Sequence, residues 1–142
     1  MSTRILALLA AIAFAIDAAV HASNASFYDP AHGGLITEGN LFRAEAALAA
    51  LVSLLLVVRP TRGVWTLAIA TAGSALAAVI LYRYVDVGAI GPIPNLYEPT
   101  WQVPGKLLSA YAEASAVAIS AAGAIHARAR SLHRPTVRPL YQ

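Results

Sequence analysis

Two residues capable of acid–base chemistry, Asp17 and His21, are four positions apart in an apolar stretch of the sequence. This spacing puts both side chains on one face of a helix. A carboxylate in that position can orient an imidazole and raise its basicity, or both groups can ligate a divalent metal. We expect a structural hydrogen bond from this pair and predict no metal site.

Glu113 lies about two turns into a later stretch of Ala and Ser, whose small side chains leave room around its carboxylate. Two interpretations are open. Glu113 forms an ion pair with Arg43 or Arg83 that fixes the helix register, or it is a proton-accepting or ligand-binding carboxylate. The same two interpretations apply to Glu45, because Arg43 is its near neighbour.

Four long apolar runs must position these residues. The chain is 58% hydrophobic and 12% charged, with a mean hydropathy of +0.64, whereas about a quarter of the residues in a soluble domain are charged. We predict an all-α bundle of four transmembrane helices over residues 5–21, 41–58, 64–84 and 107–127, in one domain of residues 1–127. If the second helix begins early, Glu38, Phe42 and Glu45 share one face.

The arginines predict the orientation in the membrane. They precede the first run, separate the second from the third and follow the fourth, without acidic neighbours: Arg4, Arg59, Arg62, Arg128, Arg130, Arg134 and Arg138. The positive-inside rule therefore places both termini and a basic tail (128–142) in the cytoplasm and residues 22–40 and 85–106 outside. We expect a multi-pass protein of the cell (inner) membrane. The alternative is that the first run is a signal peptide with a cleavage site at 20–22, which would leave three helices.

Counting 1.5 Å per helical residue brings seven charged residues to one level near the outer leaflet. They are Asp17, Arg43, Glu45, Arg83, Asp86, Lys106 and Glu113. Ionised groups in hydrocarbon are costly unless paired or hydrated, so this level predicts mutual neutralisation or a hydrated pocket. The predicted ligand-binding or ion-pair residues are Asp17, His21, Arg43, Glu45, Arg83, Lys106 and Glu113.

The segment between the third and fourth runs contains four prolines, Pro92, Pro94, Pro99 and Pro104, so it cannot be a continuous helix. Because it is also apolar, we expect an outer loop that lies as a lid over the charged level; a rigid connector is the alternative. Tyr97 and Trp101 are predicted to anchor it at the outer interface, and Trp65 to anchor the inner one.

The small residues of the third and fourth runs favour close contact between those two helices. We therefore expect them to build the core, with leucine-rich faces of the first two helices toward lipid.

The composition excludes several classes of function. Without cysteine, the chain has no thiol chemistry, disulfides, thiolate-bound zinc or iron–sulfur clusters. His126 and His133 fall on the cytoplasmic side, so only His21 and His32 could form a haem-ligating pair, and no pattern supports one. The net charge of +3 comes from arginines that mark the cytoplasmic face, so we predict no nucleic-acid partner.

His21, Tyr28 and Gly39-x-Leu41-Phe42 form a pattern that resembles one in small uncharacterised four-helix inner-membrane proteins of high-GC bacteria. The pattern covers roughly the first half of the chain. This resemblance implies the architecture and membrane residence, and no activity.

Three hypotheses for function follow. The first is a non-enzymatic accessory or interaction subunit, with a protein partner or a second copy, whose charged level holds the helices together. The second is a binding or catalytic protein for a small amphiphile, a quinone or a lipid, held beside Glu113, Glu45, Asp17 and His21. Proton-coupled transport is third, because the ionisable groups all lie toward one side. The sequence identifies no cofactor.

Overall fold

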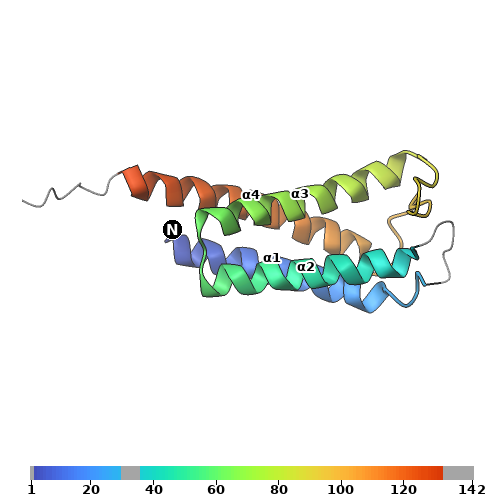
Figure 1. Ribbon diagram of the computed structural model, residues 1–142, viewed down its shortest axis with the longest axis horizontal. Coiled ribbons are helices and arrows are strands. Elements are labelled where there is room, and N and C mark those ends of the chain that lie inside the picture. The colour runs from blue at the N-terminus through green and yellow to red at the C-terminus, as the bar shows by residue number, and fades with distance from the viewer. Residues whose placement is uncertain (1, 30–35, 133–142) are drawn as a thin grey trace, which may run out of the picture.

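Four helices form an up-and-down bundle in the computed structural model, which describes residues 2–29 and 36–132 (Figure 1). They are α1 (Thr3–Asn24), α2 (Glu38–Val58), α3 (Arg62–Tyr84) and α4 (Lys106–Leu132). All four are long and apolar enough to cross a membrane. The predicted all-α class and four long apolar helices are confirmed, with bounds that differ by a few residues at the ends.

The first three helices begin where a hydroxyl side chain caps them. The hydroxyl of Ser2 accepts a hydrogen bond from the backbone N–H of Ile5, and Thr37 and Thr61 accept from Asn40 and Val64 in the same way. The cap at Thr37 starts α2 at Glu38, before the predicted residue 41. Helix α4 continues through Leu132, beyond the predicted end of the fourth helix at residue 127. His133, Arg134 and Arg138 lie outside the described residues.

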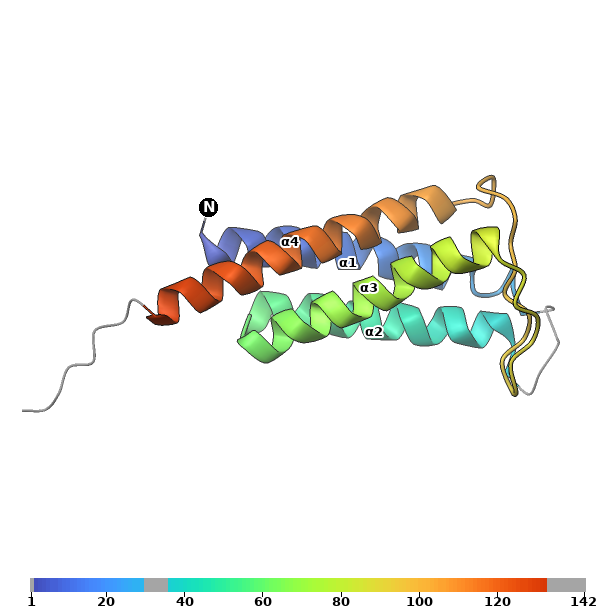
Figure 2. The same cartoon turned by 90° about the horizontal axis from the view of Figure 1, so that it is seen from above.

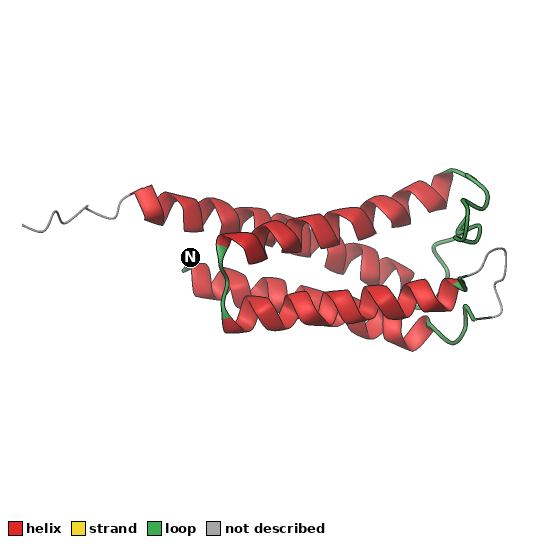
Figure 3. Ribbon diagram, in the orientation of Figure 1, coloured by secondary structure: helices red, strands yellow, loops and turns green. Residues whose placement is uncertain are grey.

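The described parts of the first long connection, 25–29 and 36–37, lie at the same end of the bundle as the second, 85–105 (Figure 3); we call this the loop end. The short α2–α3 turn, the start of α1 and the end of α4 lie at the other end, which we call the turn end. At the turn end, the guanidinium of Arg4 on α1 donates a 2.6 Å hydrogen bond to the carbonyl of Val57 on α2.

Helix α1 has the most buried face of the four and packs against both α2 and α4 (Figure 2). Ala7, Ala10 and Ala11 are buried on this face, whereas Leu8 and Ile12 are exposed on the other. Small side chains three and four residues apart let helix backbones approach closely. The expected contact between α3 and α4 is present, but α1, which carries the same small-residue spacing, also builds the core through its contacts with α2 and α4. The leucine-rich faces of α1 and α2 do point out of the bundle, as expected.

Trp65 is fully buried at 0% exposure, where it packs against α4 at Gly123. The prediction that Trp65 anchors the chain at a membrane interface is wrong, since an anchoring ring must reach the headgroups. A Cβ atom on Gly123 would overlap the indole ring. The absence of a side chain at Gly123 therefore lets α3 and α4 come together around the tryptophan.

We predict that Gly123→Ala destabilises the bundle more than Gly73→Ala does. The two changes gain the same helix propensity, but a Cβ on Gly73 has no atom within 4 Å. The difference in stability between the two variants therefore measures the overpacking against Trp65, which typically costs about 1–3 kcal/mol. Thermal unfolding of both variants in detergent gives this difference. Equal unfolding midpoints would show that the close contact of α3 and α4 at Gly123 does not limit stability.

Candidate functional site

A cavity of about 390 Å³ is lined by residues of the loop end. Figure 1 shows α2 and α3 diverging at this end. The cavity wall is mostly apolar, with ionisable side chains distributed around it. The residues that line it on α2 and α3 are Glu38, Leu41, Phe42, Ala44, Glu45, Leu48, Ala75, Ala78, Val79 and Tyr82. Those from the rest of the chain are Val20, His21, Asn24, Tyr28, Leu96, Glu98, Val103, Lys106, Ser109 and Glu113.

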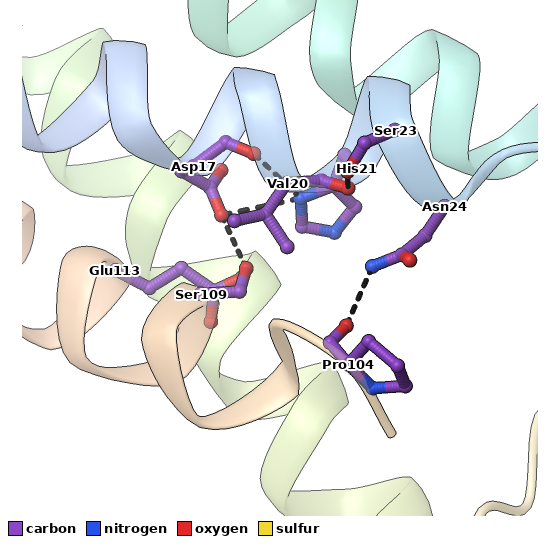
Figure 4. Close-up of polar contacts among 8 residues, drawn as sticks. All are labelled: Asp17, Val20, His21, Ser23, Asn24, Pro104, Ser109 and Glu113. Atoms are coloured by element: carbon purple, nitrogen blue, oxygen red, sulfur yellow. Dashed lines mark hydrogen bonds and ion pairs between the residues drawn. The ribbon is translucent and has the colours of Figure 1, made fainter.

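Beside this cavity, four polar residues of α1 and α4 meet in what we call the Asp17 cluster: Asp17, His21, Ser109 and Glu113 (Figure 4). His21 Nδ1 lies 3.2 Å from Asp17 Oδ1 and 3.2 Å from the Asp17 carbonyl, which confirms the hydrogen bond expected from their spacing. Ser109 donates to Asp17 Oδ1 at 2.5 Å and to Glu113 Oε1 at 3.3 Å. Asp17 and Glu113 are only 2% and 1% exposed, so both carboxylates are shielded from solvent.

The charge balance around Glu113 is acidic. The charged groups that act on it are Asp17, His21 and Glu45. Glu113 Oε2 and Glu45 Oε1 are buried and have no hydrogen-bond partner in the described part of the chain. Buried polar atoms normally have partners, so these two oxygens mark positions where a ligand group could bind.

Neither arginine pairs with Glu113 among the described residues, so that predicted ion pair is wrong. Arg43 instead makes a bidentate pair with Asp29, at 2.6 and 2.7 Å, with its side chain 48% exposed. Arg83 lies over the rings of Tyr84 and Trp101, at 4.9 and 5.7 Å from their centroids. The reason is helical phase: successive residues are rotated by about 100°, so a helix that turns Glu45 inward turns Arg43 outward.

The remaining predicted charges divide between the cavity and the loop. Lys106 lines the cavity and donates a 2.7 Å hydrogen bond to the carbonyl of Glu98. Asp86 accepts hydrogen bonds from the backbone of Gly88 and from the Asn95 amide. The seven charges therefore do not all neutralise one another, which was the first of the two predicted alternatives. Glu45, Lys106 and Glu113 line the cavity and Asp17 lies beside it, so the second alternative, a hydrated pocket, stays a prediction.

The residues that carry the sequence resemblance come together at the same end. Phe42 stacks on Tyr28 at 4.5 Å between ring centroids and contacts the His21 ring at 5.1 Å. Gly39 donates its backbone N–H to the Tyr28 carbonyl, and a Cβ there would overlap the Ala25 carbonyl. Burial, together with the negative charges of Glu98 and Glu38, raises the pKa of Tyr28 to about 12. The phenol therefore stays neutral at the cavity wall.

Sequence reasoning missed three parts of this site: Ser109, Tyr28 as a lining residue, and Glu98. Ser109 is four residues before Glu113, so helical spacing could have found it. The positions of Tyr28 and Glu98 depend on how two non-helical segments fold over the cavity, for which the sequence has no comparable signal. Of the predicted aromatic anchors, Tyr97 is exposed and Trp101 is half-buried beside Arg83 and Lys106. His32 lies outside the described residues.

Chemically, the Asp17 cluster can exchange protons, accept hydrogen bonds or bind a cation. Asp17, His21 and Glu113 each offer a ligand atom, and these atoms lie within 4.8 Å of one another. The chain matches no protein-family model, no curated protein and no solved structure. Any conclusion about function must therefore rest on this geometry.

We predict that Ser109→Ala destabilises the fold by about 1–3 kcal/mol, since a buried charged acceptor on Asp17 loses its hydroxyl donor. Ser23→Ala is the matched control, because its exposed hydroxyl donates only to the Val20 carbonyl of its own helix. Thermal unfolding in detergent compares the two variants. A Ser109→Ala protein as stable as Ser23→Ala would mean that the Asp17–Ser109 contact contributes nothing to stability.

Proposed function

We propose that this chain is a multi-pass membrane protein that binds a small amphiphile in the cavity at its loop end. The observation that carries the proposal is the cavity itself, which combines an apolar wall with buried carboxylate oxygens that lack partners. Ligand sites typically have this composition, with a few polar groups in a largely apolar pocket of about 300–1,000 Å³.

The outer surface of the bundle supports membrane residence. Large apolar side chains are exposed along all four helices, among them Leu8, Ile12, Leu54, Ile80 and Ile125. Water disfavours so much contiguous apolar surface, whereas lipid solvates it. With the arginines concentrated at the turn end, the positive-inside rule favours a cytoplasmic turn end and an outward-facing loop end in the cell membrane.

The charges around the cavity limit the class of ligand. Glu38, Glu45, Glu98 and Glu113 line it, against the single ammonium group of Lys106. An anionic headgroup such as a phosphate would be repelled by this set. A headgroup that donates hydrogen bonds, as the hydroxyls of a quinol or of a hydroxylated or amino lipid do, would satisfy Glu113 Oε2 and Glu45 Oε1.

The segment 85–105 supports a lid over the bound headgroup. It contributes Leu96, Glu98 and Val103 to the cavity wall. Its backbone is held at several points: Glu98 N–H donates to the Tyr82 carbonyl at 3.0 Å, and the Asn24 amide donates to the Pro104 carbonyl at 2.9 Å. A segment attached in this way shields the polar end of the cavity from water.

The accessory-subunit hypothesis remains a prediction. The exposed apolar side chains that a protein partner would cover are the same ones that lipid would cover, so they do not favour a partner. The resemblance to small bacterial inner-membrane proteins is compatible with both functions. A retained α1 suits ligand binding better than a cleaved one, because α1 supplies Asp17 and His21.

The proposed orientation predicts opposite labelling of two single-cysteine variants, Gln102→Cys at the loop end and Arg59→Cys at the turn end. Both positions are exposed, and the chain has no other cysteine. In spheroplasts, a membrane-impermeant maleimide should label Gln102→Cys at once and Arg59→Cys only after permeabilisation. The reverse labelling pattern would show that the loop end faces the cytoplasm. Equal labelling of both variants before permeabilisation would contradict the proposal that the chain spans the membrane.

Ligand binding predicts that Ala78→Phe, which fills the cavity from α3, reduces co-purified amphiphile at least ten-fold. The matched control is Ala77→Phe, since Ala77 is the exposed neighbour on the same helix and does not line the cavity. Both proteins would be purified in mild detergent, extracted with organic solvent and analysed by mass spectrometry. Equal amounts from the two variants, or a wild-type protein that yields no bound amphiphile, would contradict the proposal.

A further inference from the structure

We propose that Asp17, His21 and Glu113 bind a divalent first-row transition metal ion, Zn²⁺ or Mn²⁺. The three side chains come from α1 and α4, and their ligand atoms lie within 4.8 Å of one another. This metal site is independent of the proposed amphiphile binding, because all of its residues belong to the Asp17 cluster.

The distances suit metal ligation. Ligands about 2.0–2.2 Å from one ion lie roughly 3.0–3.5 Å apart in neighbouring coordination positions. His21 Nδ1 and Asp17 Oδ1 are 3.2 Å apart, within that range. All three ligand atoms lie within 4.8 Å of one another, so a small movement of the side chains, of about 1 Å, would bring them to coordination distances. Figure 4 shows this side chain extending from α4 toward Ser109 and Asp17.

The charge balance calls for a cation. Asp17 and Glu113 are almost fully buried, and Glu45 faces them from α2. Among the described residues His21 is the one basic group that pairs with them, and it supplies at most a single positive charge. Lys106, another basic residue at the loop end, donates to the Glu98 carbonyl. A divalent ion would neutralise the two carboxylates, as protonation would in its absence.

A second observation points to a missing ligand. Glu113 Oε2 is buried and has no hydrogen-bond partner in the described part of the chain, although Oε1 of the same carboxylate is bonded to Ser109. Ser109 also donates to Asp17 Oδ1, as hydrogen-bond donors commonly do to the carboxylates that hold metals. The cluster therefore has both ligands and a supporting residue.

The donor set selects the class of ion. One imidazole nitrogen and two carboxylates suit zinc, manganese or ferrous iron, whereas magnesium and calcium prefer oxygen alone. The absence of cysteine from the chain removes competition from thiolates. Since His21 and Glu113 also line the cavity, a free coordination position on the ion would face it.

Equilibrium dialysis of the untagged, chelator-treated protein in detergent against Zn²⁺, with metal analysis by mass spectrometry, tests the proposal. We expect one Zn²⁺ per chain, and at least ten-fold weaker binding by Glu113→Gln and His21→Gln. Asp86→Asn is the matched control, because it removes a carboxylate from the same end of the bundle but outside the cluster. X-ray absorption of the wild-type protein should show only nitrogen and oxygen ligands with one imidazole, and it does not depend on variants that fold.

Three results would overturn the site: no stoichiometric binding by the wild type, equal binding by Glu113→Gln, or loss of the bound ion in His126→Gln, which alters the other end of α4. The cavity variant Ala78→Phe separates the two proposals. It should lose the amphiphile and keep its Zn²⁺. Failure of either measurement then leaves the other proposal standing.

Discussion

Burial of two carboxylates between α1 and α4 is the constraint on which the loop end of this protein depends. Asp17 and Glu113 are almost inaccessible to solvent; within the described residues, the Ser109 hydroxyl bonds to both carboxylates and the His21 imidazole pairs with Asp17. Such an arrangement is stable only where hydrogen bonds, protons or a cation compensate the lost solvation. The register of α1 against α4 follows from it, because Asp17 must reach Ser109.

The bundle is tightly packed at the turn end and more open at the loop end. Alanines on α1 bring it close to α2 and α4, and Gly123 admits the ring of Trp65 between α3 and α4. These contacts close the turn end. Toward the loop end α3 diverges from α2 (Figure 1), and the cavity at that end is lined by residues of all four helices. Close packing of small residues in one half of a bundle is thus compatible with a ligand-sized space in the other.

Helices and connections both contribute to the site. The helices supply Glu38, Glu45, Glu113 and most of the apolar wall, and the segment 85–105 adds Leu96, Glu98 and Val103. Aromatic contacts from Tyr28 through Phe42 to His21 link the first connection to the same site. A cavity assembled from all four helices and from residues of both long connections requires the whole bundle.

Features that depend on near neighbours along the chain could be predicted from the sequence. Four helices followed from long apolar runs, and the Asp17–His21 contact followed from a spacing of four residues. Which helix faces meet became visible only in the folded chain: Ser109 reaches Asp17 across 92 positions, Arg43 pairs with Asp29, and Trp65 is buried. Small-residue stretches occur on three helices, so they do not identify which helices pair. The depth of a residue along its helix does not show which way its side chain points. The physical reason is that rotational phase and helix pairing arise from packing between distant segments, which no local pattern encodes.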